Sequence, residues 1–186
     1  DATAIMMALK AVFNLPAQVI ANILKAVGFA INLIASALQV VFGLAAEAIA
    51  NILKIAGFLI QEITMALSVV FGLAAQAIAG ILNLIGFAAD LIAGALRTVF
   101  NLGAAAVAEI LGALGYSLMV ISQILKDVFT LGAEAIANVL NEVFDVTNDV
   151  VTGILNGLGF AADVIADALE SVFGAVGDVF CGIFGC

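Results

Sequence analysis

The sequence contains no histidine and no tryptophan among its 186 residues, and it has a single proline. Histidine is the most common general base and metal ligand near neutral pH, so its absence argues against most acid–base and zinc chemistry. No Gly-rich phosphate loop follows a strand-like segment, which disfavours the phosphate-binding folds. We therefore predict that the chain is not an enzyme and needs no metal or cofactor.

Charged residues are also scarce, at 10% of the chain against about 25% in ordinary soluble domains. The five basic residues form no stripe that would neutralise phosphates, so nucleic acid is an unsuitable partner. Residues 127–186 hold nine acids and no base, which accounts for the whole net charge of −9. This acidic part either serves solubility or controls association, because acid or divalent cations would remove its self-repulsion.

The chain has two cysteines, Cys181 and Cys186. No histidine or second cysteine pair is present to complete a zinc site, and the spacing is not that of a redox Cys-x-x-Cys motif. Two interpretations remain: a disulfide, within or between chains, or two free thiols. A disulfide would indicate an oxidising setting, so we predict an extracellular or cell-surface protein, with a membrane location as the alternative.

Apolar residues, in contrast, make up 66% of the chain, against roughly 45–50% in typical soluble domains. The polar residues are too few to cover the apolar core that such a chain can build. Exposed apolar surface on this scale usually marks association or contact with lipid. The predicted partners are therefore copies of the same chain, with a membrane or lipid surface as a further possibility.

The apolar residues follow an internal repeat of 29 residues, which is clearest when Ala37–Met65 is compared with Ala66–Gly94. Each repeat divides into a long half of 15 residues and a short half of 14. Long and short halves alternate from Ala8, but two long halves follow one another at 124–138 and 139–153. We predict a repeat array over residues 1–167, starting within a repeat and carrying the extra half at 139–153, followed by an acidic, Cys-bearing end over 168–186.

Polar and small residues recur at steps of three or four, which predicts α-helix and excludes strands. In the second repeat this polar stripe comprises Gln39, Gly43, Glu47, Asn51, Lys54, Gln61 and Met65. The stripe is narrow, so a helix bearing it would need apolar neighbours on about three sides. The fold class is therefore predicted to be all-α.

Two positions in each repeat suggest helix breaks. The seventh residue of the long half is always of a type preferred at helix N-caps, and Pro16 fits the first helical turn after Asn14. These residues are Asn14, Gly43, Gly72, Asn101, Thr130, Asp145 and Gly174. Each short half carries a glycine suited to a left-handed helix C-terminus, at Gly28, Gly57, Gly86, Gly115 and Gly159.

These breaks favour stacked short helices, an α-solenoid or bundle, with segments such as Leu44–Gly57 and Phe58–Gly72. The alternative is a long, kinked helical rod in which the glycines allow close helix approach. The extra half-repeat shifts the repeat pattern by about half a residue, or roughly 50° around a helix. We therefore expect a local irregularity between Ile124 and Gly153.

Aromatic residues form a ladder with the period of the repeat, and we predict that the ladder serves packing or assembly. Its members are Phe13, Phe29, Phe42, Phe58, Phe71, Phe87, Phe100, Tyr116, Phe129, Phe144, Phe160 and Phe173. Carboxylates cluster at Asp145 and Asp149, and at Asp163, Asp167 and Glu170. A hard cation such as calcium is conceivable there, although a solvated polar face is the simpler interpretation.

Three functions remain compatible with these patterns. The first is a self-assembling structural protein that forms filaments or fibres through its apolar helical faces. The second is a membrane-inserted or lipid-binding helical protein, such as a pore or channel former, whose polar stripe lines the pore or faces water. The third is a helical scaffold whose concave face binds a protein or an apolar ligand.

Overall fold

The computed structural model describes residues 1–174, and this part of the chain forms twelve α-helices and no strand. The all-α prediction is confirmed. The helices are short and packed against one another, so the chain adopts the stacked short helices that the break positions favoured and not a continuous rod. The predicted segments Leu44–Gly57 and Phe58–Gly72 contain α4 (Ala46–Ile55) and α5 (Ile60–Phe71).

Packing divides the chain into two compact units, residues 1–101 and 102–186. The boundary predicted at residues 167 and 168 rests on charge and cysteine content, which this division does not test. The helices of the first unit are α1 (Ala2–Phe13), α2 (Ala17–Ala26), α3 (Ile31–Phe42), α4, α5, α6 (Ala75–Leu84) and α7 (Ala89–Phe100). In the second unit they are α8 (Ala104–Ala113), α9 (Leu118–Asp127), α10 (Ala133–Phe144), α11 (Asn148–Gly157) and α12 (Ala162–Phe173).

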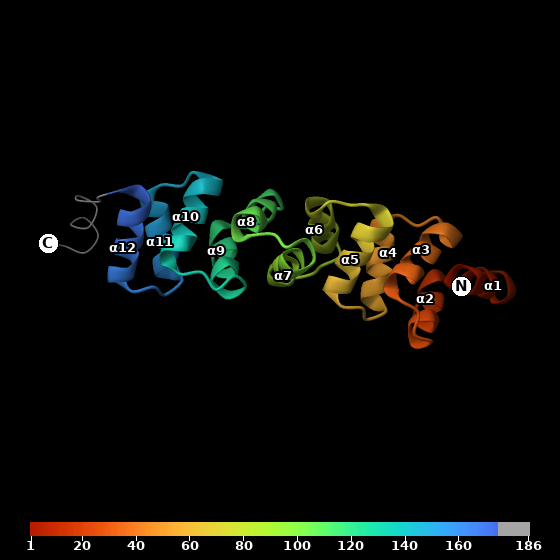
Figure 1. Cartoon of the computed structure of the whole chain (residues 1–186). Helices are drawn as coiled ribbons and strands as arrows, with labels where there is room; N and C mark the ends of the chain where they lie inside the picture. Colours follow the sequence, from red (N-terminus) through yellow and green to blue (C-terminus); the bar gives the residue numbers. More distant parts are fainter. Residues whose placement is uncertain (175–186) are drawn as a thin grey trace. The chain divides into compact units, whose positions relative to one another are not determined.

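The first unit is a two-layered helical repeat (Figure 1). Its odd-numbered helices have 12 residues each, and every one of them packs on the next odd-numbered helix. The even-numbered helices have 10 residues each and form the second layer in the same way. Residues one repeat apart therefore occupy equivalent places in neighbouring helices of one layer.

The extra half-repeat changes this arrangement in the second unit, where we expected an irregularity. Helix α10 is built from the two successive long halves, so it has 12 residues where the alternation would give 10. It shares a layer with α8 and α12, while α9 packs on α11. In the second unit, helices of 10 and 12 residues therefore share one layer, as α8 and α10 do. Helix α9 also ends early, at Asp127, and the N–H of Leu131 donates to the carbonyl of Leu125.

The glycines of the short halves end helices as predicted. Gly28 has φ 91°, and its N–H donates to the carbonyl of Lys25 while the N–H of Phe29 donates to that of Leu24. This pair of bonds is a Schellman motif, which satisfies carbonyls that the helix leaves without partners. Gly57, Gly86, Gly115 and Gly159 repeat the positive φ.

The break at the seventh position of the long half is confirmed, but the predicted capping role was wrong. Six of these residues end the preceding helix instead of starting the next, and Thr130 follows the early end of α9. Positive φ is common to all seven: Asn14, Gly43, Gly72, Asn101, Thr130, Asp145 and Gly174. Asn, Asp and Gly tolerate this conformation and are also common N-caps, so residue type alone did not separate the two roles. Pro16 is itself the N-cap of α2, one residue before the first turn.

The core is organised by a leucine at the second position of every half-repeat. These are Leu9, Leu24, Leu38, Leu53, Leu67, Leu82, Leu96, Leu111, Leu125, Leu140, Leu155 and Leu169. All are at most 2% exposed except Leu9, which is half-buried. Ile34, Ala35 and Ala37 surround Leu38 on the buried face of α3. Fully burying a leucine contributes about 1.5–3 kcal/mol, so this ladder accounts for much of the stability of the stack.

Candidate functional site

The aromatic ladder lies at the C-terminal ends of the helices. In the long halves the aromatic residue is the last residue of a helix, as Phe42 is in α3, or closely follows one. In the short halves it follows the left-handed glycine, as Phe58 follows Gly57. All twelve predicted residues are half-buried except Phe13, which is 65% exposed. Their role in assembly between chains stays a prediction.

Lysine side chains connect four of these aromatic residues to a neighbouring helix of the same layer. The Nζ of Lys10 in α1 lies 2.8 Å from the carbonyl oxygen of Val41 and 4.3 Å from the ring centroid of Phe42. Lys25 repeats the arrangement, with its Nζ 2.8 Å from the carbonyl oxygen of Ala56 and 4.5 Å from the ring of Phe58. We call each such contact a lysine clamp.

Two further clamps follow the same geometry, one in each unit. The Nζ of Lys54 bonds the carbonyl oxygen of Ile85 at 2.5 Å and lies 4.6 Å from the ring of Phe87. Lys126 reaches the carbonyl oxygen of Leu158 at 2.6 Å, with the ring of Phe160 at 5.1 Å. Each clamp thus joins a helix to the next one in its layer.

The clamps combine two favourable interactions. The last carbonyls of a helix carry partial negative charge, and a cation near them contributes about 0.3–1 kcal/mol at an exposed site. A lysine over an aromatic face contributes about 0.5–1 kcal/mol more at such a site. The aromatic ladder and the lysines therefore stabilise the order in which the helices stack.

Sequence reasoning did not find the clamps, although a signal was present. Every basic residue of the chain occupies the third position of a half-repeat: Lys10, Lys25, Lys54, Arg97 and Lys126. A charge confined to one repeat position indicates a role in packing between repeats. That role became visible only when the helices one repeat apart were found side by side.

At Gly112, a third position without a side chain, an aromatic ring occupies the space. Gly112 is the third residue of its half, and a Cβ added to it would lie 2.6 Å from Cε1 of Phe144. In the last described half-repeat this position holds Glu170, an exposed carboxylate that can supply no cationic contact.

The apolar residues that remain exposed also follow the repeat. Val40 and Val69 are fourth residues of long halves on α3 and α5, and they are 66% and 65% exposed. Ile55 and Leu84 are fourth residues of short halves on α4 and α6, and they are 62% and 72% exposed. Each layer of the first unit therefore carries large apolar side chains at equivalent places. We call these four residues the fourth-position set.

The predicted polar stripe is divided between the two layers. Gln39 and Gln61 are exposed on α3 and α5, whereas Glu47 and Asn51 are exposed on α4. Apolar and polar side chains thus share each outer surface.

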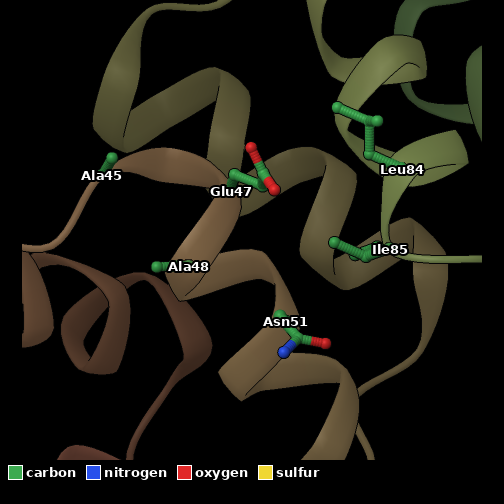
Figure 2. A pocket seen from close by; sticks show the side chains of 6 residues that line it. All are labelled: Ala45, Glu47, Ala48, Asn51, Leu84 and Ile85. Atoms are coloured by element: carbon green, nitrogen blue, oxygen red, sulfur yellow. The ribbon is translucent and has the colours of Figure 1, made fainter.

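A hollow of about 560 Å³ lies between α4 and α6, lined by Glu47, Asn51, Leu84 and Ile85 among others (Figure 2). At the equivalent place between α2 and α4, the Nε2 of Gln18 donates to the carbonyl oxygen of Ile52 at 3.1 Å. Glu47 holds the same repeat position as Gln18, but an ionised carboxylate cannot donate such a bond. The hollow is thus a gap in the stacking where one polar link is missing.

The second unit has a similar hollow of about 390 Å³ between α8 and α10, lined by Ala105, Ala106, Glu109, Glu142 and Val143. Neither hollow brings a nucleophile next to a base. Among residues 1–174, no group of three or more His, Cys, Asp or Glu side chains could hold a metal ion. The set Asp163, Asp167 and Glu170 therefore does not form the cation site that its spacing allowed.

Two further predictions concern the membrane and the cysteines. Within the described part of the chain, every helix is too short or too polar to cross a lipid bilayer. Cys181 and Cys186 lie outside the described residues, so their pairing stays a prediction. Comparisons with protein-family models, curated proteins and solved structures found no match.

Proposed function

We propose that this chain is a self-assembling structural protein, forming filaments or fibres through the apolar faces of its helical repeats. The observation that carries the proposal is the exposure of the fourth-position set. Folding buries the second-position leucines of the repeats but leaves Val40, Ile55, Val69 and Leu84 at 62–72% exposure. Burying one such side chain against another copy would contribute about 1.5–3 kcal/mol, and the set recurs along the unit.

Charge supports an association that is controlled. The first unit holds four acids and four bases, whereas residues 102–186 hold ten acids and one base. A neutral, partly apolar unit can approach another copy without repulsion, while the acidic unit resists close contact. Assembly is therefore expected to increase in mildly acidic buffer, where carboxylates begin to bind protons.

Copies of the same chain suit this surface better than an anionic membrane. The first unit holds as many acids as bases, so it has no excess of positive charge to attract anionic lipid headgroups. An extracellular or cell-surface setting, with Cys181 and Cys186 as a disulfide that locks the assembly, belongs to the same proposal.

The test is electron microscopy and light scattering of the protein in detergent-free buffer, at neutral and mildly acidic pH. We expect regular filaments or sheets from the natural chain. The double variant Val40→Ser/Val69→Ser should reduce the scattering strongly, because it removes exposed apolar area without touching the core.

The matched control is Gln39→Ser/Gln61→Ser, which alters exposed polar residues on the same two helices and should leave assembly unchanged. The aromatic residues are less suitable for this test, because Phe87 contacts Lys54 within its own chain and its loss would weaken the fold. Protein that is recovered only in detergent, as discrete rings or bundles, would contradict the proposal and favour the membrane-inserted alternative.

A further inference from the structure

Helix α1 has an apolar face that no other helix of the first unit covers. Ile5 is 39% exposed and Val12 is 72% exposed. Their neighbours on this face are Ala8, which is exposed, and Leu9, which is half-buried. These four residues, spaced at i, i+3, i+4 and i+7, form one stripe of the helix, which we call the open face of α1.

The repeat shows what normally covers this face. The equivalent residues of α3 are Ile34, Ala37 and Leu38, which are fully buried, and Val41, which is half-buried. Helix α3 packs on α1, and the residues that α1 presents on that side include Ala2 and Met6, at most 2% exposed, with Lys10. The surface that covers such a face within the repeat therefore comes from a 12-residue helix. It presents two small or flexible apolar residues and a hydrogen-bond donor at the third position of the half-repeat.

The open face of α1 also lacks the clamp. In α3, the carbonyl of Val41 accepts the bond from Lys10, and Phe42 lies beneath the ammonium group. The equivalent groups of α1 are the carbonyl of Val12 and the ring of Phe13. No side chain of residues 1–174 donates to that carbonyl, and Phe13 is 65% exposed where Phe42 is half-buried.

Helix α12 presents the matching side. Its residues Ala162, Ala166 and Glu170 occupy the repeat positions that Ala2, Met6 and Lys10 occupy in α1. Ala162 and Glu170 are exposed and Ala166 is half-buried, although α12 packs on both α10 and α11. We call Ala162, Ala166 and Glu170 the leading face of α12. It is a long-helix surface with the correct spacing but with an acid in place of the lysine.

We propose that the open face of α1 binds the leading face of α12 from a second copy, and that Glu170 weakens this contact by its charge. The proposal rests on the proposed function in requiring that copies associate, and it adds a second contact, separate from the fourth-position set. The contact is heterologous, joining different surfaces of the two copies, so its repetition produces a ring or an open filament.

The charge argument follows from the clamp geometry. Docking in the manner of α1 on α3 would place the carboxylate of Glu170 near the carbonyl of Val12, where a helix C-terminus already carries partial negative charge. Other carboxylates on the elements around it, Asp163 and Asp167 on α12, Glu134 and Glu142 on α10, and Asp149 on α11, add to the negative potential. A lysine at position 170 would convert this repulsion into a fifth clamp of the type described.

The experiment compares three forms of the chain by sedimentation velocity at neutral pH: the natural protein, Glu170→Lys and Glu109→Lys. Glu109→Lys is the matched control, because it makes the same substitution at an exposed position of α8, outside the leading face and apart from the carboxylates named around Glu170. We expect Glu170→Lys to form dimers and larger species at concentrations where the other two chains do not. Adding Ile5→Asn to Glu170→Lys should return it to the behaviour of the natural protein.

Circular dichroism of each chain provides the folding check. Equal association of Glu170→Lys and Glu109→Lys would overturn the proposal, since net charge alone would then explain the effect. A natural chain that assembles, with Ile5→Asn and Glu170→Lys each without effect, would also overturn it and leave the proposed self-assembly intact. Absence of association from every chain under every condition would overturn both.

Discussion

At the scale of single residues, two types of side chain each have a fixed position in the half-repeat. Leucine at the second position of a half-repeat forms the core, and the described lysines at the third position link neighbouring helices. Because 66% of the chain is apolar, the hydrophobic effect alone cannot distinguish one stacking order from another. The lysine clamps add a directional contact between helices that are neighbours in one layer.

This role predicts a cost for removing one clamp. Replacing Lys54 with Met keeps the apolar stem but deletes the bond to the carbonyl of Ile85 and the contact with Phe87. We expect the free energy of unfolding to fall by about 1 kcal/mol, the sum of a helix-end and a cation–π contribution. The measurement is urea denaturation followed by circular dichroism.

Gln76→Met is the control for that variant, because Gln76 is an exposed polar residue on α6. It should leave the denaturation midpoint within error of the natural protein. An equal loss of stability in both variants would show that replacing a polar side chain with Met lowers stability by itself, without any role for the clamp.

At the scale of helices, the sequence predicted where helices end better than how they end. Gly28 and its equivalents were assigned correctly, because glycine before an apolar residue fits few structures other than a left-handed helix end. Asn14 and Asp145 were assigned to the wrong helix, since their side chains suit an N-cap as well as positive φ.

The clamps escaped prediction for a different reason. Lys10 and its acceptor Val41 are 31 residues apart, and the bond requires the two helices to be parallel neighbours in one layer. Periodicity gives the spacing of equivalent residues but not which helices touch. The change of layer in the second unit illustrates the same limit. The extra half-repeat predicted a rotation of the repeat pattern around the helix, but not which helices would pack together.

Glycine substitutions test the helix ends directly. Gly115 has φ 85° and no atom within 4 Å of an added Cβ, so Gly115→Ala isolates backbone strain from steric clash. A left-handed conformation costs an L-residue roughly 1–2 kcal/mol, and we expect a loss of stability of that size. Gly80→Ala is the matched control, since Gly80 lies inside α6 with equally open surroundings.

Alanine is favoured over glycine in a helix interior by about 1 kcal/mol, so Gly80→Ala should stabilise the protein. Denaturant midpoints measured side by side give the comparison. If Gly115→Ala and Gly80→Ala shift the denaturant midpoint in the same direction, Gly115 is not at a left-handed helix end.

At the scale of the molecule, the two units differ in charge far more than in fold. Both stack helices of 10 and 12 residues around buried leucines, but the first is neutral and the second carries the entire net charge. Apolar contact therefore favours association through the first unit, while repulsion between the second units opposes it. The extent of assembly depends on the balance of these two terms.

Ionic strength weakens the electrostatic repulsion between second units and barely changes the apolar attraction between first units. The Debye length falls from about 10 Å at 0.1 M salt to about 3 Å at 1 M, so salt screens the repulsion between exposed carboxylates. Burial of the fourth-position set, which drives association in our proposal, is not weakened by salt. We therefore expect light scattering at neutral pH to rise as sodium chloride is raised from 0.05 to about 1 M.

The control for the salt series is sucrose at matched osmolality, which leaves the charges unscreened, and Val40→Ser/Val69→Ser should respond weakly to the salt. Scattering that decreases with salt would mean that attraction between charges holds the copies together. Since the second unit contains only one base, that attraction would have to come from the bases of the first unit meeting the acids of the second. The direction of the salt effect thus distinguishes apolar contact between first units from charge pairing between unlike units.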